Sequence, residues 1–182
     1  MSEQAGKYAR FELERRFLAR RLPEGIAEDR GWRITDRYIA YTFLRLRQME
    51  PIHGGEAVLK LGQKHVPSPP DFARMTITNI YLSPEEYAVL AKLPAAELQK
   101  RRLSITDEGR TFSLDVFDGH LLGLVLAELG FETAEEMDQS ISLPSWVVRD
   151  VSDDIRFTGG ALAGLSAAEA RELIHDAAPR SG

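Results

Sequence analysis

Charged side chains recur at even spacings in several short segments of this sequence. The segment FELERRFLAR, residues 11–20, places Glu12, Glu14 and Arg16 at alternate positions. Alternate residues of a β-strand point to the same face, so these three side chains would share one face. Even spacing also groups basic residues in three later segments, as Arg45 with Arg47, Lys60 with Lys64, and Lys100 with Arg102.

Such charged faces must meet either bulk water or one another. In a dry core, desolvation of each ion would be too costly to repeat many times. A closed barrel with a wet lumen avoids this, because charged residues line the inside and apolar faces pack outside. Clustered carboxylates are typical ligands of hard divalent cations. Clustered Arg and Lys repel one another unless a polyanion binds, so the two sets together indicate a ligand that combines a metal ion with phosphate.

Alternating, β-branched and aromatic residues predict the strands that would build this barrel. They are expected at residues 8–18, twice within 32–48, at 56–65 and 73–82, in a hairpin of 100–106 and 110–117, and at 122–131. Ser83, Thr133 and Ser166 each begin a helix pattern, with acidic residues in the first turn. Strands outnumber helices, so the fold class is α+β, built on one antiparallel sheet or barrel.

Three smaller features complete this prediction. Phe11, Leu13 and Phe17 form the apolar face of the first strand, which helices are expected to cover. Gly62, between the paired lysines, is consistent with a β-bulge. The pair Gly159-Gly160 matches no phosphate-loop pattern and is expected to be a turn.

Composition limits the class of protein. The chain has 182 residues, 43% of them hydrophobic, and no cysteine, which fits one globular domain without disulfides or thiolate metal sites. A net charge of −5 argues against nucleic-acid binding. Its apolar runs are too short to span a membrane, and residues 1–10 lack the apolar region of a secretory signal, so a cytoplasmic protein is expected.

In order and spacing, the charged motifs resemble those of the CYTH domains, also called triphosphate tunnel metalloenzymes. The family signature Glu-x-Glu-x-Lys is matched by residues 12–16, and the later motifs follow over about residues 8–165. They are Arg45-x-Arg47, a strand lysine at Lys60 or Lys64, a strand arginine at Arg74, Lys100-x-Arg102, Asp115 in a DVF segment, and Glu128 at the end of GLVLAE.

The resemblance implies an eight-stranded antiparallel β-barrel that forms a tunnel, with helices packed outside. It implies one domain over residues 1–182, with its core at about 8–165 and a C-terminal helix at 166–177. It also implies hydrolysis of a small triphosphate, inorganic triphosphate being the simplest, with Mg²⁺ or Mn²⁺ as cofactor, in a monomer or homodimer.

Residue roles also follow from the resemblance. The implied metal ligands are the carboxylates Glu12, Glu14, Asp115 and Glu128. Arg16 would bind phosphate or orient the attacking water through a carboxylate, which makes it catalytic together with Glu12 and Glu14. The remaining basic residues would bind phosphate oxygens, and they are Arg45, Arg47, Lys60, Lys64, Arg74, Lys100 and Arg102.

The sequence also departs from the family pattern. Arg16 replaces the signature lysine, and Gly130 stands where many members have a second glutamate. Thr76 and Thr78 occupy positions where many members place acidic residues. The smaller number of acidic residues leaves open an alternative, a non-catalytic module that binds polyphosphate or nucleotide. An adenylate cyclase, another activity of the family, is a further alternative, although no sequence feature identifies an adenine pocket.

Overall fold

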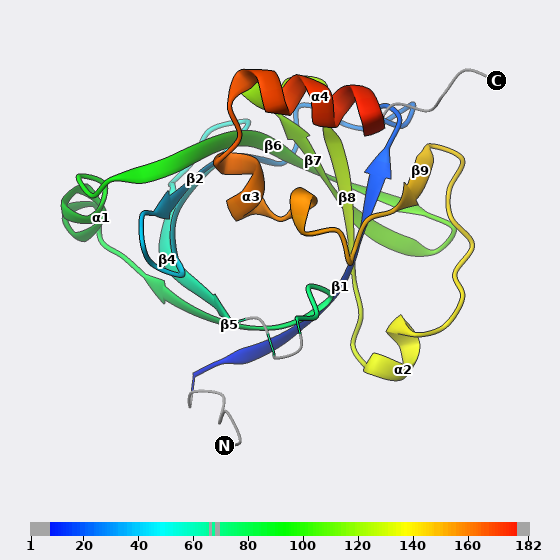
Figure 1. Ribbon diagram of the computed structural model, residues 1–182, viewed down its shortest axis with the longest axis horizontal. Helices are drawn as coiled ribbons and strands as arrows, with labels where there is room; N and C mark the ends of the chain where they lie inside the picture. Colours follow the sequence, from blue (N-terminus) through cyan, green and yellow to red (C-terminus); the bar gives the residue numbers. More distant parts are fainter. Residues whose placement is uncertain (1–7, 66, 68–69, 178–182) are drawn as a thin grey trace.

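The computed structural model describes residues 8–65, 67 and 70–177, so both ends of the expected domain lie outside the described residues. Its strands form one antiparallel sheet (Figure 1). Their bounds are β1 Arg10–Ala19, β2 Trp32–Ile39, β3 Leu44–Pro51, β4 Val58–His65, β5 Arg74–Tyr81, β6 Ala95–Asp107, β7 Arg110–Phe117, β8 Val125–Gly130 and β9 Val147–Asp150.

Strand β1 closes the sheet into a barrel. The strands follow the order β5-β4-β3-β2-β6-β7-β8-β1, and β1 also pairs with β5. Residues 10–13 of β1 pair with β5, whereas residues 14–18 pair with β8. The short strand β9 joins the second half of β1 where β5 has diverged. The expected eight-stranded antiparallel barrel is thereby confirmed, with β9 as an additional strand that the sequence did not predict.

Register decides which side chains face the lumen. Arg47 lies opposite Asp36 on β2 and Lys60 on β4, and Arg102 lies opposite Asp115 on β7. Residues directly opposite each other in antiparallel strands project to the same face. The charged faces of neighbouring strands are therefore continuous, and together they form the inner wall.

The helices differ in where they lie relative to the barrel. Their bounds are α1 Pro84–Leu90, α2 Ala134–Met137, α3 Gly159–Ala163 and α4 Ala167–Ala177, with 3₁₀ turns at Gly119–Leu121 and Ile155–Phe157. In Figure 1, α1, α2 and α4 lie outside the barrel, as expected, whereas α3 lies within the outline of its opening. Helix α3 contacts β2 and β6, and α4 packs on the first 3₁₀ turn. None of the described helices is long and apolar enough to cross a membrane.

Local sequence signals account for the ends of several elements. The Ser83 hydroxyl accepts a hydrogen bond from the Glu86 amide, and the Glu86 carboxylate accepts one from the Ser83 amide, which forms the capping box at α1. Glu108 and Gly109 both have positive φ, at 48° and 75°, as a two-residue hairpin turn of type I′ requires. The strand expected at 122–131 is shorter than predicted. It begins only at Val125, and Leu122 before it is 72% exposed.

The outer face of β1 is covered differently from the prediction. Phe17 is fully buried and meets Phe112 edge-on at 6.3 Å, while Phe112 meets Trp146 edge-on at 5.2 Å. Trp146 precedes β9, so this cover comes from a loop and not from a helix. Phe11 is 78% exposed. The expectation that helices cover Phe11 and Phe17 was therefore wrong.

Candidate active site

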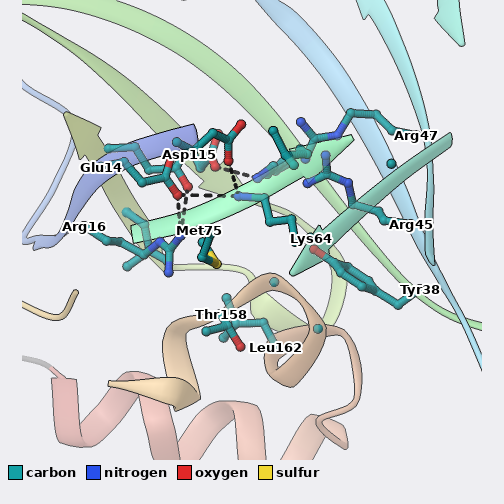
Figure 2. A pocket seen from close by; sticks show the side chains of 18 of the residues that line it. Glu14, Arg16, Tyr38, Arg45, Arg47, Lys64, Met75, Asp115, Thr158 and Leu162 are labelled. Atoms are coloured by element: carbon teal, nitrogen blue, oxygen red, sulfur yellow. Dashed lines mark hydrogen bonds and ion pairs between the residues drawn. The ribbon is translucent and has the colours of Figure 1, made fainter. Parts of the chain in front are cut away.

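The lumen contains a cavity of about 530 Å³ that opens between the charged strands and the α3 segment. Figure 2 shows Thr158 and Leu162 on the α3 side, with Glu14, Arg16 and Asp115 among the charged side chains beyond them. Basic residues outnumber acidic ones in its lining. The charged lining residues are Glu12, Glu14, Asp115 and Glu128, with Arg16, Arg45, Arg47, Lys60, Lys64, Lys100 and Arg102.

Asp36 on β2 anchors the two arginines of β3. Its carboxylate is fully buried and accepts hydrogen bonds from Arg47 Nε at 2.5 Å and Arg47 Nη2 at 2.6 Å. Arg45 Nε lies 3.7 Å from the same carboxylate. Burial alone would raise the pKa of Asp36, but the charge and hydrogen bonds of Arg47, with the charge of Arg45, hold it below its ordinary value.

Sequence reasoning missed Asp36. The signal that could have found it is parity, because Ile34, Asp36 and Tyr38 share one face of β2 and the Asp is the one ionisable acid on that face. Two apolar or aromatic neighbours on the same face indicate an enclosed position for the carboxylate. Its partner could not be named without the register that sets Asp36 opposite Arg47.

Asp115 anchors a second pair of cations. It accepts hydrogen bonds from Lys100 Nζ at 2.5 Å and from Arg102 at 2.7 and 2.6 Å. Burial opposes ionisation of Asp115, but Arg102 and Lys100 outweigh it and lower the pKa of this carboxyl group. Three hydrogen bonds occupy its oxygens, so the geometry favours a role in positioning Lys100 and Arg102 over the predicted role as a metal ligand.

The predicted carboxylates Glu14 and Glu128 are joined by Arg16. Arg16 Nη2 donates to Glu14 Oε1 at 3.0 Å and to Glu128 Oε1 at 3.4 Å, while Arg102 Nη2 donates to Glu128 Oε2 at 2.5 Å. Burial would raise the pKa of Glu128, yet Arg102 and Arg16 hold it well below its ordinary value. Glu14 differs, because burial and the charge of Glu128 raise its pKa despite Lys64 and Arg16.

Glu12 stands at the edge of this group. Lys64 Nζ lies 2.7 Å from Glu12 Oε2 and 3.7 Å from Glu14 Oε1. The shorter contact is an ion pair without hydrogen-bond alignment, and the buried Glu12 Oε2 has no hydrogen-bond partner among the described residues. Glu12 and Glu14 are therefore bridged by one flexible ammonium group.

Several basic groups keep donor capacity that the protein does not use. Arg16 Nη1 and Arg45 Nε are buried and, within the described part of the chain, donate no hydrogen bond. Such donors are rare in native proteins, because a buried unpaired polar group is costly. Burial, together with the charges of Arg47 and Arg45, lowers the pKa of Lys60. An anion in the cavity would stabilise protonated Lys60.

The acidic residues fit a hard divalent cation in donor chemistry, since their oxygens are the ligands that such cations prefer. Burial and the neighbouring Glu128 carboxylate raise the pKa of Glu14. A nearby cation would stabilise the ionised form of this carboxylate and so lower its pKa again. Among the described residues, however, no three acidic or histidine side chains are close enough together to hold a metal ion. The carboxylates are kept apart because Arg16 and Lys64 lie between them and form ion pairs with them.

Arg74 is not brought to the cavity. It pairs with Leu13 in the β1–β5 register, and its guanidinium binds Asp71 at 2.9 Å and Asp138 on the outside of the barrel. Met75 and Ile77 face the lumen from β5, so Thr76 and Thr78 lie on its other face. The positions expected to carry acidic residues are therefore not lumen positions. The expected phosphate-binding position of Arg74 was wrong for the same reason.

Two glycines also shape the lumen. Gly62 lies in continuous register with β3 and β5, so the expected bulge is absent there. A Cβ at Gly62 would come within 2.9 Å of Asn79 Oδ1, so glycine allows this side chain to approach β4 closely. Gly130 lies directly opposite Glu14, and its Cβ position has no atom nearer than 4.0 Å. The missing glutamate therefore leaves open space beside Glu14.

The pair Gly159-Gly160 begins α3 and is not a turn. A Cβ at Gly159 would come within 1.9 Å of the Tyr38 hydroxyl, and one at Gly160 would lie 3.6 Å from the Tyr38 ring. Both glycines line the cavity, as does Tyr38. The close approach of this aromatic ring therefore explains the first glycine.

No model of a known protein family matches the sequence. An inorganic triphosphatase from Nitrosomonas europaea is 31% identical over 160 residues, which cover 84% of this chain and 96% of the relative. The chain belongs to the inorganic triphosphatase family.

Solved structures agree with this assignment. The crystal structure of an inorganic triphosphatase matches with a TM-score of 0.58 at 25% identity, covering 85% of this chain and 95% of that one. A second crystal structure of the same protein matches with a TM-score of 0.57 at 26% identity, covering 84% of this chain and 97% of that one. The fold thus corresponds over nearly the full length of an inorganic triphosphatase.

Proposed function

We propose that this protein is a CYTH-type hydrolase that cleaves a small triphosphate, inorganic triphosphate above all, within its lumen. One observation carries the proposal. The basic side chains that line the cavity outnumber the carboxylates that line it. A compact polyanion would compensate this excess of positive charge. The relationship to an inorganic triphosphatase supports the same substrate class.

The residues divide into two groups in this reaction. Arg45, Arg47, Lys60, Lys100 and Arg102 bind the non-bridging oxygens and neutralise the charge that develops as the terminal phosphoryl group leaves. Water attacks the terminal phosphorus, the bond to the bridging oxygen breaks, and phosphate and pyrophosphate are released. Asp36 and Asp115 hold the arginine and lysine side chains in position and do not contact the substrate.

The carboxylates account for the cofactor we propose, Mg²⁺ or Mn²⁺. Glu12, Glu14 and Glu128 would hold the ion, which would supply charge neutralisation on the phosphate oxygens when bound. In the protein alone these carboxylates are paired with Arg16, Lys64 and Arg102. We infer that phosphate oxygens take over these cations on binding and so free the carboxylates. Arg16, which cannot act as a base, orients the attacking water through Glu14 or Glu128.

Neighbouring residues on β6 give a matched test of this proposal. Arg102 lines the cavity, whereas Arg101 points outward and pairs with Glu28 at 2.9 Å. Phosphate release from inorganic triphosphate would be measured with Mg²⁺ or Mn²⁺ for the wild type, Arg102→Gln and Arg101→Gln. We expect Arg102→Gln to lower kcat/KM by about 100-fold or more, in the range for loss of one charge-stabilising donor. Arg101→Gln should retain wild-type activity.

Glu14→Gln separates catalysis from mere binding. Loss of turnover with retained triphosphate binding, measured by calorimetry, is the result expected for a metal-dependent hydrolase. Triphosphate binding without turnover in the wild type, unaffected by metal, would instead show a non-catalytic binding module. Formation of cyclic AMP from ATP would show a cyclase. Equal phosphate release by the wild type, Glu14→Gln and Arg102→Gln would exclude this cavity as the active site.

A further inference from the structure

Arg16 lies where β1 exchanges one neighbouring strand for another. On one side of β1, Arg16 is opposite Glu128 of β8. On the other side, the register with β5 ends at Leu13 and the register with β9 begins at Phe17, so Arg16 lies between the two. Arg16 is buried, and its backbone amide therefore needs a hydrogen-bond partner from within the protein.

The segment that follows β9 supplies this partner. The Arg16 amide donates to Ser152 Oγ at 2.9 Å, and the Val151 amide donates to the Arg16 carbonyl at 2.8 Å. A serine hydroxyl thus takes the place of the carbonyl that a paired strand would offer. Both backbone groups of Arg16 are held by two consecutive residues, and Ser152 is itself buried.

Asp150 fixes the orientation of the Ser152 hydroxyl. Ser152 Oγ donates to Asp150 Oδ1 at 2.5 Å, and the Ser152 amide donates to the same oxygen at 2.8 Å. The other carboxylate oxygen accepts two hydrogen bonds from Arg15, at 2.9 and 2.6 Å. Burial would raise the pKa of Asp150, but the hydrogen bonds from Ser152 and Arg15 hold it below its ordinary value. The hydroxyl gives its one proton to Asp150 and so presents a lone pair to the Arg16 amide.

This backbone contact matters because the side-chain contacts of Arg16 change in the proposed reaction. Arg16 Nη2 donates to Glu14 and Glu128, the carboxylates that would turn to the metal ion when substrate binds. The backbone is then the part of Arg16 whose position does not depend on the ligand. A shift of β1 at this point would displace the guanidinium, and misplacement by about 1 Å can lower a rate by about 100-fold.

We propose that Ser152 is a positioning residue that holds the backbone of Arg16 from outside the barrel and so places its guanidinium for the reaction. This inference rests on the proposed function and adds a residue that does not touch the substrate. Ser152 lines an outer hollow of about 340 Å³ rather than the charged cavity. In Figure 1 the chain passes from β9 beside β1 to α3, so the same segment connects this contact to the α3 side of the cavity.

Substitution of Ser152 tests the proposal through the separate values of kcat and KM. Hydrolysis of inorganic triphosphate with Mg²⁺ would be compared for the wild type, Ser152→Ala, Ser152→Thr and Asp153→Ala. We expect Ser152→Ala to lower kcat by about 10- to 100-fold with little change in KM. Ser152→Thr keeps the hydroxyl, and the outer hollow has room for its methyl group, so it should restore most of the wild-type kcat. Asp153→Ala, at the exposed neighbouring residue, should match the wild type.

A second comparison determines whether Ser152 acts through Arg16. Adding Ser152→Ala to Arg16→Gln should lower kcat no further, because the guanidinium to be positioned is already absent. Rates would be measured at a temperature at which circular dichroism shows every variant to be folded. A loss by the same factor in both backgrounds would overturn the proposal. A lower Tm of Ser152→Ala with unchanged kcat would also overturn it, since that result shows a structural role alone.

Nuclear magnetic resonance gives a measurement that does not depend on turnover. The Nε–Hε resonance of Arg16, assigned from its loss in Arg16→Gln, should shift in Ser152→Ala and stay in place in Asp153→Ala. If the wild type does not hydrolyse inorganic triphosphate, the proposed function fails, yet this shift would still support the positioning role. An unchanged resonance in Ser152→Ala would overturn that role, whether or not the protein is a triphosphatase. The same resonance decides the question if Arg16→Gln has no residual turnover.

Discussion

At the scale of single residues, the lumen is a set of buried charges that stabilise one another in pairs. Asp36 is the clearest case, because it is fully buried and its two oxygens are occupied by Arg47. Removing one partner of a buried pair leaves the other charge uncompensated. This destabilises the protein more than replacing both partners by well-packed apolar residues does. The positioning carboxylates are thus as necessary for the fold as for the site.

Asp36→Asn should therefore lower the free energy of unfolding by about 3 kcal/mol, since Arg47 would keep its charge without a counter-ion. Urea denaturation at pH 7 without triphosphate would measure the loss. Asp154→Asn is the matched control, because Asp154 pairs with Arg156 on the surface, where Arg156 is 56% exposed. We expect less than about 1 kcal/mol for the control. Equal losses in both variants would contradict the assignment of Asp36 as the anchor of the buried arginine.

At the scale of secondary structure, α3 determines the shape of one side of the cavity. Two consecutive glycines begin this short helix, although glycine is a poor helix former. Only the first is required by contact, because the Tyr38 hydroxyl occupies the place where a Cβ of Gly159 would lie. At Gly160 the nearest atom of the Tyr38 ring would be at an ordinary contact distance of 3.6 Å.

Alanine substitutions at these two adjacent glycines should therefore have different effects on the stability of the protein. Gly159→Ala forces the Tyr38 ring or α3 to move and should destabilise the protein by about 1–3 kcal/mol, as overpacking usually does. Gly160→Ala should be neutral or stabilise it by up to about 1 kcal/mol, because alanine favours a helix. Thermal and urea denaturation would measure both effects. The same change in both variants would show that Tyr38 does not constrain the start of α3.

At the scale of the whole molecule, an acidic protein encloses a basic cavity. The net charge is −5, yet basic residues predominate in the cavity lining. Low-dielectric walls around like charges focus their field at the opening, which favours the entry of anions. The carboxylates within the wall keep this concentration of positive charge compatible with a folded barrel. Their ionisation therefore links the stability of the barrel to pH.

The direction of this pH dependence follows from the pKa values. Those of Asp36, Asp115 and Glu128 are lowered in the folded state, from ordinary values of 3.8, 3.8 and 4.5. Groups of this kind contribute stability that is present above the ordinary pKa and is lost as the pH falls through the folded one. Glu14, with its raised pKa, contributes in the opposite sense. Because three of these carboxyl groups have a lowered pKa and one has a raised pKa, we expect a net loss of stability at acid pH.

We therefore expect the free energy of unfolding to fall as the pH decreases from about 5. Urea denaturation at several pH values between 7 and 3 would measure this change. In Glu14→Gln the opposing contribution is removed, so the loss between neutral and acid pH should be larger than in the wild type. Stability that stays constant or rises toward pH 3 would show that the ion pairs of the lumen do not contribute as assigned.

The sequence by itself determined which residues share a face. A strand repeats every two residues, and this local rule was enough to group Glu12 with Glu14, Arg45 with Arg47 and Lys100 with Arg102. Caps and turn residues, which also act locally, identified the starts of α1, α2 and α4 and the hairpin at Glu108. Strand β9 was missed because its four residues show no clear pattern and depend on pairing with β1.

Only the tertiary structure decided which face is inside and what each charge meets there. Periodicity allows Arg74 to face either way, and pairing with Leu13 turned it outward. Asp36 became an anchor because register places it opposite Arg47. Pairing between distant strands depends on the packing of the whole barrel. That packing is a non-local property, which the spacing within one segment does not contain.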